Sequence, residues 1–211
     1  MIPATGHDTK SELTKATATK DGTITDRCQV CGWIVAKRTI PRASSIKLSY
    51  TSYTYNGLVK TPTVTVKDAK GKSLTKNTDY TVSYTAGRKN VGTYKVTITL
   101  KGNYSGSKML SFKINPKGTS ISSMTRYSKA FTVKWKKQST QTSGYQILYS
   151  TSSKFKSGNK YVTVTSNKTT AKKITKLKSK KKYYVKIRTY KTVNGTRYYS
   201  GWSSVKYVTT K

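Results

Sequence analysis

The sequence predicts an all-β chain that is built from tandem antiparallel β-sandwiches. Three observations support this prediction: segments in which apolar and polar residues alternate recur along most of the chain, turn residues separate these segments, and no segment has the periodicity of an amphipathic helix. Only 34% of the 211 residues are hydrophobic, but the 17 tyrosines and the many valines and threonines favour strands over disorder.

Residues 43–116 are predicted to form the first sandwich. Turn signals such as Tyr55-Asn56-Gly57 and Lys101-Gly102-Asn103 separate its segments, and apolar and polar residues alternate most regularly over residues 94–100. Several short strands with turns at such intervals are typical of an antiparallel sandwich. The predicted strands are 46–50, 64–66, 80–84, 94–100 and 109–114.

Residues 117–211 are predicted to form a second sandwich. Trp135 is expected to face inward with Phe131 and Val133, because these three residues alternate with polar ones. A turn at Asn194-Gly195 follows the longest segment. This number of strands in about 95 residues is typical of an immunoglobulin-like sandwich. The predicted strands are 121–124, 131–135, 145–149, 161–164, 173–174, 183–190 and 205–208.

The charge of the chain is strongly positive and unevenly distributed. The 42 lysines and arginines outnumber the six aspartates and glutamates, which gives a formal net charge of +36. All six acids precede Tyr80, so the net charge is +3 in residues 1–42, +10 in residues 43–116 and +23 in residues 117–211. Such a chain attracts polyanions at low ionic strength, and charge alone leaves nucleic acid, anionic membrane and anionic cell-wall polymer open.

The composition excludes several classes of function. Paired catalytic carboxylates and carboxylate cages for Ca²⁺ or Mg²⁺ need more acids than the chain offers. Two cysteines cannot make a disulfide scaffold, and no apolar run has the about 20 residues of a transmembrane helix. His7, Asp8 and a serine make a catalytic triad only on paper, because no nucleophile elbow accompanies them. We therefore expect no enzyme activity, no catalytic residues and no cofactor-binding residues.

Residues 1–42 are predicted to form a small cysteine-containing module. Its Cys28-x-x-Cys31-Gly32 motif is half of a zinc-ribbon knuckle, and His7, the single histidine of the chain, is the candidate third ligand. A closed zinc site has four ligands, so this one is a ligand short. Three interpretations stay open: an incomplete knuckle with free or oxidised thiols; zinc completed by water, by Asp8 or by a neighbouring chain; and a redox pair, which the lack of a βαβ pattern disfavours.

Two lysine-rich runs are the candidate polyanion-binding segments. One surrounds Trp135, and the other lies in the predicted loop before the strand that begins at Tyr183. Lysines in such places also keep strand edges soluble, so a binding role and a solubilising role are both open. Without a basic helix or an RNP-like motif, a specific nucleic-acid partner is not expected. The candidate residues are Lys134, Lys136, Lys137, Lys178, Lys180, Lys181 and Lys182.

Residues 117–211 resemble a bacterial fibronectin type III domain. The resemblance rests on Trp135, on the Leu177-to-Tyr183 spacing of a tyrosine corner, and on Trp202-Ser203 followed by Thr209-Thr210. Some receptor domains of this fold stack arginines between tryptophans. Here only Arg188 with Trp202 is expected to form such a contact.

The rest of the chain resembles repeats of Gram-positive surface proteins. Residues 46–114 are similar to small bacterial Ig-like repeats of the MBG type, through Thr61-Pro62-Thr63-Val64, Asp79-Tyr80-Thr81-Val82 and Gly102-Asn103-Tyr104. The N-terminal stretch is similar to a Cys-x-x-Cys-Gly repeat, through its Ile2-Pro3 and Ile40-Pro41 phrases. Such repeats often carry a further cysteine where this chain has Ala18.

Tandem modules of these kinds are typical of large secreted proteins of gut Firmicutes, and this implies the function that we expect. The chain would be a monomeric stalk or anchor at the cell surface or outside the cell. It would space a functional domain from the Gram-positive cell wall and hold anionic wall polymer by charge. Two alternatives stay open: an adhesion module that binds a host protein or glycan, and an accessory region of a secreted enzyme.

Overall fold

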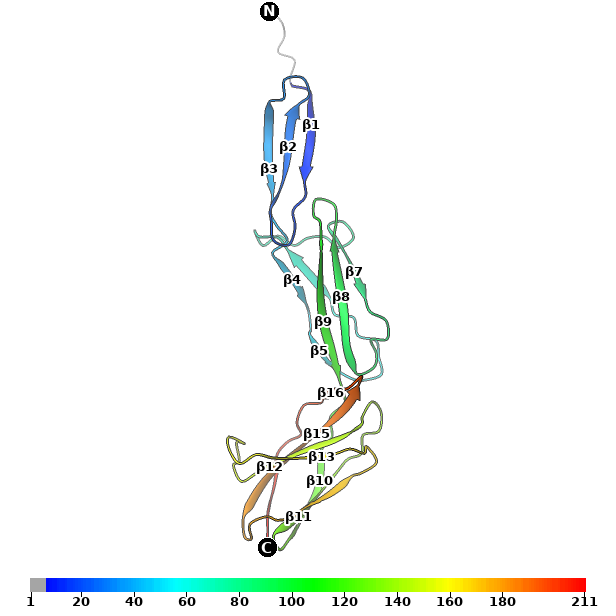
Figure 1. Ribbon diagram of the computed structural model, residues 1–211, viewed down its shortest axis with the longest axis vertical. Helices are drawn as coiled ribbons and strands as arrows, with labels where there is room; N and C mark the ends of the chain where they lie inside the picture. The colour runs from blue at the N-terminus through cyan, green and yellow to red at the C-terminus, as the bar shows by residue number, and fades with distance from the viewer. Residues whose placement is uncertain (1–6) are drawn as a thin grey trace, which may run out of the picture. The chain divides into compact units, whose positions relative to one another are not determined.

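The computed structural model describes residues 7–211, and the chain is all-β in this range (Figure 1). The described residues form no helix, and therefore none that is long and apolar enough to cross a membrane. The Ile2-Pro3 phrase lies outside the described residues. The chain divides into two compact units, and each is made of three separate stretches of sequence. The first unit comprises the chain up to residue 51 together with residues 61–86 and 94–112. The second comprises residues 52–60, 87–93 and 113–211.

The N-terminal sheet has three antiparallel strands in the order β1-β2-β3. The register pairs Thr9 with Cys28 at one end and Thr14 with Thr23 at the other. Every residue of β1 is exposed, so this sheet has very little apolar core of its own. Sequence patterning missed these strands because β1 and β3 carry polar or charged residues on both faces. Their bounds are β1 (Thr9–Thr14), β2 (Gly22–Cys28) and β3 (Ile34–Ile40).

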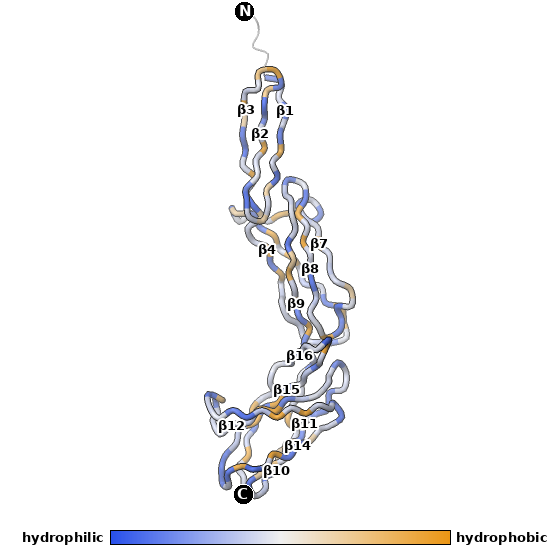
Figure 2. Tube along the Cα trace, viewed as in Figure 1, coloured by the Kyte–Doolittle hydropathy of each residue, from blue (hydrophilic) through white to orange (hydrophobic). Residues whose placement is uncertain are grey.

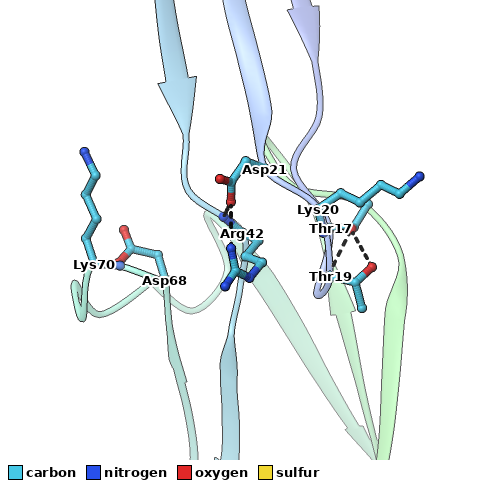
Figure 3. A network of polar contacts seen from close by, with 7 residues as sticks. All are labelled: Thr17, Thr19, Lys20, Asp21, Arg42, Asp68 and Lys70. Atoms are coloured by element: carbon cyan, nitrogen blue, oxygen red, sulfur yellow. Dashed lines mark hydrogen bonds and ion pairs between the residues drawn. The ribbon is translucent and has the colours of Figure 1, made fainter.

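Polar contacts hold the β1–β2 turn against the segment that follows β3 (Figure 3). Asp21 Oδ1 accepts a hydrogen bond from the Arg42 backbone N–H at 2.8 Å and lies 3.6 Å from Arg42 Nη1. The Thr17 carbonyl accepts from the Ala43 N–H at 2.9 Å. Asp68 Oδ1 accepts two backbone N–H groups of its own turn. This end of the sheet is therefore held to the segment that follows β3, whereas the hydrogen bonds described at the Cys28 end join residues of the three-stranded sheet and its turns.

Residues 45–115 form a two-stranded sheet, β4-β6, and a four-stranded sheet, β5-β9-β8-β7. Fully buried apolar side chains, among them Val66, Val96, Ile98, Phe112 and Ile114, form the core. The five predicted strands are present, and β5 is an addition. Its three residues pair in parallel with the end of β9, so no local alternation revealed it. The bounds are β4 (Ser45–Leu48), β5 (Ser52–Thr54), β6 (Val64–Lys67), β7 (Tyr80–Tyr84), β8 (Gly92–Leu100) and β9 (Ser107–Asn115).

The last eight strands form two sheets, β10-β11-β14 and β13-β12-β15-β16, with β17 also paired to β15. All seven predicted strands are present. The extra strand, β16, returns along β15 across Asn194-Gly195, whose positive φ angles of 45° and 77° suit a tight hairpin. The bounds are β10 (Ile121–Tyr127), β11 (Ala130–Trp135), β12 (Gly144–Ser150), β13 (Lys160–Val164), β14 (Ala171–Ile174), β15 (Lys182–Val193), β16 (Thr196–Tyr199) and β17 (Lys206–Thr209).

The core of this sandwich lies between its two sheets, and hydrophobic stretches alternate with hydrophilic ones along the strands (Figure 2). Trp135 is buried with Phe131 and Val133, as expected, and its ring centroid is 5.2 Å from that of Tyr145. The tyrosine corner is also present. The Lys178 backbone N–H donates to the Tyr183 hydroxyl at 3.1 Å, and Tyr183 itself is buried.

Removing the Tyr183 hydroxyl should destabilise this sandwich. Tyr183→Phe leaves the Lys178 N–H without its acceptor, and we expect a loss of about 1–2 kcal/mol in the free energy of unfolding. Urea unfolding of the whole chain, followed by near-ultraviolet circular dichroism, measures this loss. Tyr207→Phe is the matched control, because the Tyr207 side chain is 63% exposed. Equal effects of the two changes would show that the corner hydrogen bond contributes nothing.

Candidate functional site

The predicted polyanion-binding lysines lie in two separate places. Strand β11 pairs with β14 so that Phe131 faces Ile174 at one end and Lys134 faces Ala171 at the other. The run Lys134–Lys137 begins at the second end, whereas Lys178–Lys182 follows the first end. Three residue steps of β-strand separate these ends by about 10 Å, before the loops add to the distance. Lys134, Lys136 and Lys137 are not among the residues that line the cleft beside the second run.

The second run borders a cleft of about 400 Å³, which we call the lysine cleft. Lys160 enters it from the start of β13, because the register of β12 and β13 pairs Lys160 with Tyr149. Lys160 and Lys176 were not among the predicted residues, since only strand pairing and loop geometry bring them to the run. The cleft is lined by Tyr149, Thr151, Gly158, Lys160, Lys176, Leu177, Lys178, Lys181 and Tyr183.

Hydrogen bonds hold the loop that carries three of these lysines. The Thr210 hydroxyl donates to the Lys178 carbonyl at 2.7 Å and accepts from the Lys181 N–H at 3.1 Å. The Leu177 N–H donates to the Lys129 carbonyl, and the Leu177 side chain is buried in the core. The backbone of the loop is thus fixed by contacts that do not use the lysine ammonium groups. These groups remain available to a ligand.

The electrostatics of the lysine cleft follow from the distribution of acids. No aspartate or glutamate occurs between Tyr80 and the end of the chain, so the domain that contains the cleft has no side-chain carboxylate to pair with its lysines. Burial first, and the neighbouring Tyr183 second, raise the pKa of Tyr149, so Tyr149 is neutral in the cleft. The arrangement therefore suits a ligand with several negative charges.

Ring faces hold cations on the outer surface of the β15 sheet. The Arg188 guanidinium lies 3.8 Å from the ring centroid of Tyr199 and 4.3 Å from that of Trp202, and its Nε and Nη2 donate to Gln146 Oε1. The expected Arg188–Trp202 contact is confirmed. Lys186 Nζ also lies 5.2 Å from the centroid of the Trp202 ring. Burial lowers the pKa of Arg188, and Tyr199 and Tyr161 act in the opposite direction.

The structure also brings together the three predicted metal ligands, which we call the knuckle cluster: His7, Cys28 and Cys31. Their ligand atoms all lie within 4.8 Å of one another, and Cys31 Sγ is 3.8 Å from His7 Nδ1. Hydrogen bonds from the backbone N–H groups of Cys31 and Val30, followed by those from Cys31 and His7 side chains, lower the pKa of the Cys28 thiol to about 6. A thiolate is thus favoured at Cys28, and metal binding stays a prediction.

The residue at position 18 has no bearing on the knuckle cluster. Ala18 lies in the turn between β1 and β2, whereas Cys28 ends β2. The six residue steps from Gly22 to Cys28 separate the two ends of β2 by about 20 Å. A cysteine in place of Ala18 could not ligate the same ion, so Ala18 is not the reason for the missing fourth ligand.

A larger cavity than the lysine cleft lies elsewhere and offers no catalytic groups. It has a volume of about 720 Å³ and a mainly apolar lining. No histidine, cysteine or carboxylate is among its lining residues, so the groups of acid–base and nucleophilic chemistry are not gathered there. The lining residues are Ile46, Lys47, Leu48, Thr51, Lys95, Met109, Leu110 and Ser111.

Comparison with known proteins identifies one domain of the chain. Residues 114–206 match the fibronectin type III domain family, so this part of the chain is a fibronectin type III domain. No curated protein matches the chain.

Solved structures of low sequence identity are similar in part. The chicken CNTN1 FN1-FN3 domains are 15% identical, with coverage of 91% of this chain and 78% of that one and a TM-score of 0.41. A two-domain fibronectin type III segment of chicken tenascin is 17% identical, with coverage of 96% and 100% and a TM-score of 0.39. A β-1,2-glucanase from Parabacteroides distasonis is 15% identical, with coverage of 55% of this chain and 17% of the glucanase and a TM-score of 0.37.

Replacing Arg188 by lysine should destabilise the fibronectin type III domain. Lysine keeps the charge but loses the planar group that stacks on two rings and donates twice to Gln146, and we expect a loss of about 1–2 kcal/mol. Urea unfolding of the whole chain measures it. Arg126→Lys is the matched control, because Arg126 is exposed on β10, and it should change stability by less than about 0.5 kcal/mol. An Arg188→Lys variant as stable as this control would contradict the stacking argument.

Proposed function

We propose that this chain is a non-catalytic stalk or anchor segment of a cell-surface or secreted protein, which holds anionic cell-wall polymer of a Gram-positive cell by charge. The observation that carries the proposal is the lysine cleft, because it places four lysines around one concave surface in a domain without acids. Fibronectin type III domains generally serve as non-catalytic spacer modules in extracellular proteins, and this supports the spacer role and the extracellular location.

The chemistry of the cleft favours a polymer over a compact anion. Lys160, Lys176, Lys178 and Lys181 are all exposed and come from two segments of the chain. Repeating phosphates along a flexible chain can contact such lysines one after another, whereas a single small anion would reach only some of them. Phosphate-bearing wall polymers have this repeating charge. The run Lys134–Lys137, at the other end of the β11 strand, would add long-range attraction.

A second candidate function, adhesion to a glycan, is favoured by aromatic rings on the outer surface of the β15 sheet. Tyr161 and Tyr207 are each more than half exposed, and the rings of Tyr161 and Trp202 lie 6.5 Å apart. Exposed rings of this kind stack on the apolar faces of sugars. Binding of this type depends on ring contact, so it would survive at high salt, where polyanion binding fails.

Salt should abolish the binding of anionic polymer. If four lysines of the cleft each release one counterion, affinity falls about 100-fold between about 50 and about 200 mM salt. Isothermal titration of the whole chain with a soluble glycerol-phosphate polymer at several salt concentrations measures the slope. An uncharged polysaccharide is the control ligand and should not bind. Affinity that stays constant across this salt range would contradict the proposal that the chain holds polymer by charge, and would favour the adhesion function.

Removing charge at the cleft should weaken polymer binding more than removing the same charge elsewhere. The triple variant Lys176→Gln, Lys178→Gln, Lys181→Gln should lose at least about tenfold in affinity, since a lysine beside an anionic surface contributes about 1 kcal/mol. The matched control removes three charges from the other run by Lys134→Gln, Lys136→Gln and Lys137→Gln. Both variants lose the same net charge. If they bind equally well, the cleft is not the site, and only the net charge matters.

A further inference from the structure

We propose that the knuckle cluster binds one Zn²⁺ ion through three protein ligands, with a solvent molecule in the fourth position, and that the ion closes the end of the three-stranded sheet. The ligands are His7 Nδ1, Cys28 Sγ and Cys31 Sγ. This site is independent of the lysine cleft and of polymer binding. Zn²⁺ prefers thiolate and imidazole ligands, whereas Mg²⁺ and Ca²⁺ prefer oxygen ligands.

The distances in the cluster are close to those of a tetrahedral zinc site. With Zn–S of about 2.3 Å and Zn–N of about 2.0 Å, two ligand atoms on a tetrahedron lie about 3.5 to 3.8 Å apart. Cys31 Sγ and His7 Nδ1 are separated by 3.8 Å, and no pair in the cluster exceeds 4.8 Å. Small rotations of the side chains would bring all three atoms onto one ion. Binding would release to solvent any proton that the two cysteine sulfurs still carry.

The backbone around the cysteines forms the tight turn that a two-cysteine metal site needs. The Cys31 N–H donates to Cys28 Sγ at 3.5 Å, and the Gly32 N–H donates to the Cys28 carbonyl at 3.1 Å. Gly32 has a φ of 73°, in the left-handed region that glycine adopts without strain. Arg27 Nη1 donates to the Gly32 carbonyl at 2.9 Å and fixes the far side of the turn. These hydrogen bonds hold the two cysteines in one turn, and the ligand atoms of His7, Cys28 and Cys31 lie within 4.8 Å of one another.

Pairing between β1 and β2 brings the distant histidine to the cysteines. Thr9 pairs with Cys28 in the sheet, and the Gln29 N–H donates to the Asp8 carbonyl at 2.9 Å. The segment before β1 therefore runs beside the cysteine turn, and His7 follows from this register. This placement explains how His7, which lies 21 positions before Cys28 in the sequence, joins the same site.

No described carboxylate is placed as a fourth ligand. The cluster of possible metal ligands contains His7, Cys28 and Cys31, and no aspartate or glutamate of the described residues joins it. Asp8 is the nearest acid in sequence, but its Oδ2 accepts a hydrogen bond from Gln29 Nε2 at 3.0 Å. His7 and Cys31 are exposed, so water reaches the open side of the cluster. We therefore assign the fourth position to solvent.

The weak core of the sheet gives the ion a structural role. All six residues of β1 are exposed, and the two buried side chains of the strands, Cys28 and Ile40, lie at opposite ends of the sheet. The Ile40 end is held to the following segment by the Asp21–Arg42 contacts, whereas the hydrogen bonds described at the Cys28 end stay within the sheet and its turns. Small modules that cannot bury enough apolar surface are stabilised by metals or disulfides. An ion at the Cys28 end would supply such a constraint.

Cobalt and zinc binding to the reduced whole chain tests the proposal. Co²⁺ should give the charge-transfer absorption of thiolate ligands at one ion per chain, and Zn²⁺ should displace it. Cys31→Ser and His7→Ala change exposed residues, so folding should persist while affinity falls by about 100-fold or more, because loss of even an outer-shell partner costs about 10–100-fold. Asp8→Asn is the matched control and should bind as the unchanged chain does.

Two further measurements test the solvent ligand and the structural role of the ion. Added imidazole should shift the cobalt spectrum, because it replaces the solvent ligand. Zn²⁺ should slow tryptic cleavage at Lys10 and Arg27 in the unchanged chain and leave the rate unchanged in Cys31→Ser. Loss of binding in Asp8→Asn, one ion shared by two chains, or no cobalt binding by the reduced chain would each overturn the proposal.

Discussion

The absence of carboxylates after Asp79 is the constraint on which much of the fibronectin type III domain depends. Twenty-three lysines and arginines lie in residues 117–211, and none of them has an acidic side chain of its own domain to pair with. Several use ring faces instead: Lys182 Nζ lies 3.9 Å from the ring centroid of Tyr207, and Lys173 Nζ lies 4.8 Å from that of Tyr127. A ring attracts a cation without neutralising its charge, so the domain keeps its positive potential. The tyrosine rings thus provide contacts for cations that have no carboxylate partner in this domain.

The acids of the N-terminal half make local contacts, which include ion pairs of Glu12, Asp26 and Asp21 with nearby arginines. Asp26 accepts from Ser11 and from Arg38 at 2.6 and 2.9 Å, and Asp79 accepts from the Thr75 N–H at 2.8 Å. Asp68 is almost fully buried and closes its own turn with two backbone bonds. Acids with such fixed partners are poorly placed to screen lysines elsewhere. The gradient of net charge along the sequence therefore persists in the folded chain.

Local sequence patterns predicted the strands that have a buried face, and they failed where burial is absent. In β8, Val96, Ile98 and Leu100 alternate with polar residues because one face packs on the core, and the pattern of 94–100 predicted this strand. No such contrast marks β1, whose residues are all exposed, or β5, which has three residues and a parallel partner. The cysteine motif predicted its turn because the motif is local. Lys160 could not be assigned to the cleft, because only the register of β12 and β13 brings it there.

The two proposed sites differ in what holds them, and this difference has a physical consequence. The lysine cleft is attached to a complete sandwich, through Leu177 in the core and through Thr210 at the end of β17, so its geometry does not depend on a ligand. The knuckle cluster belongs to a sheet without a comparable core, so its geometry and the stability of its sheet end are coupled to the bound ion. Polymer binding would therefore be governed by salt, and the order of the N-terminal sheet by zinc and by the redox state of Cys28 and Cys31. Loss of the ion would therefore change the N-terminal sheet and leave polymer binding at the lysine cleft unchanged.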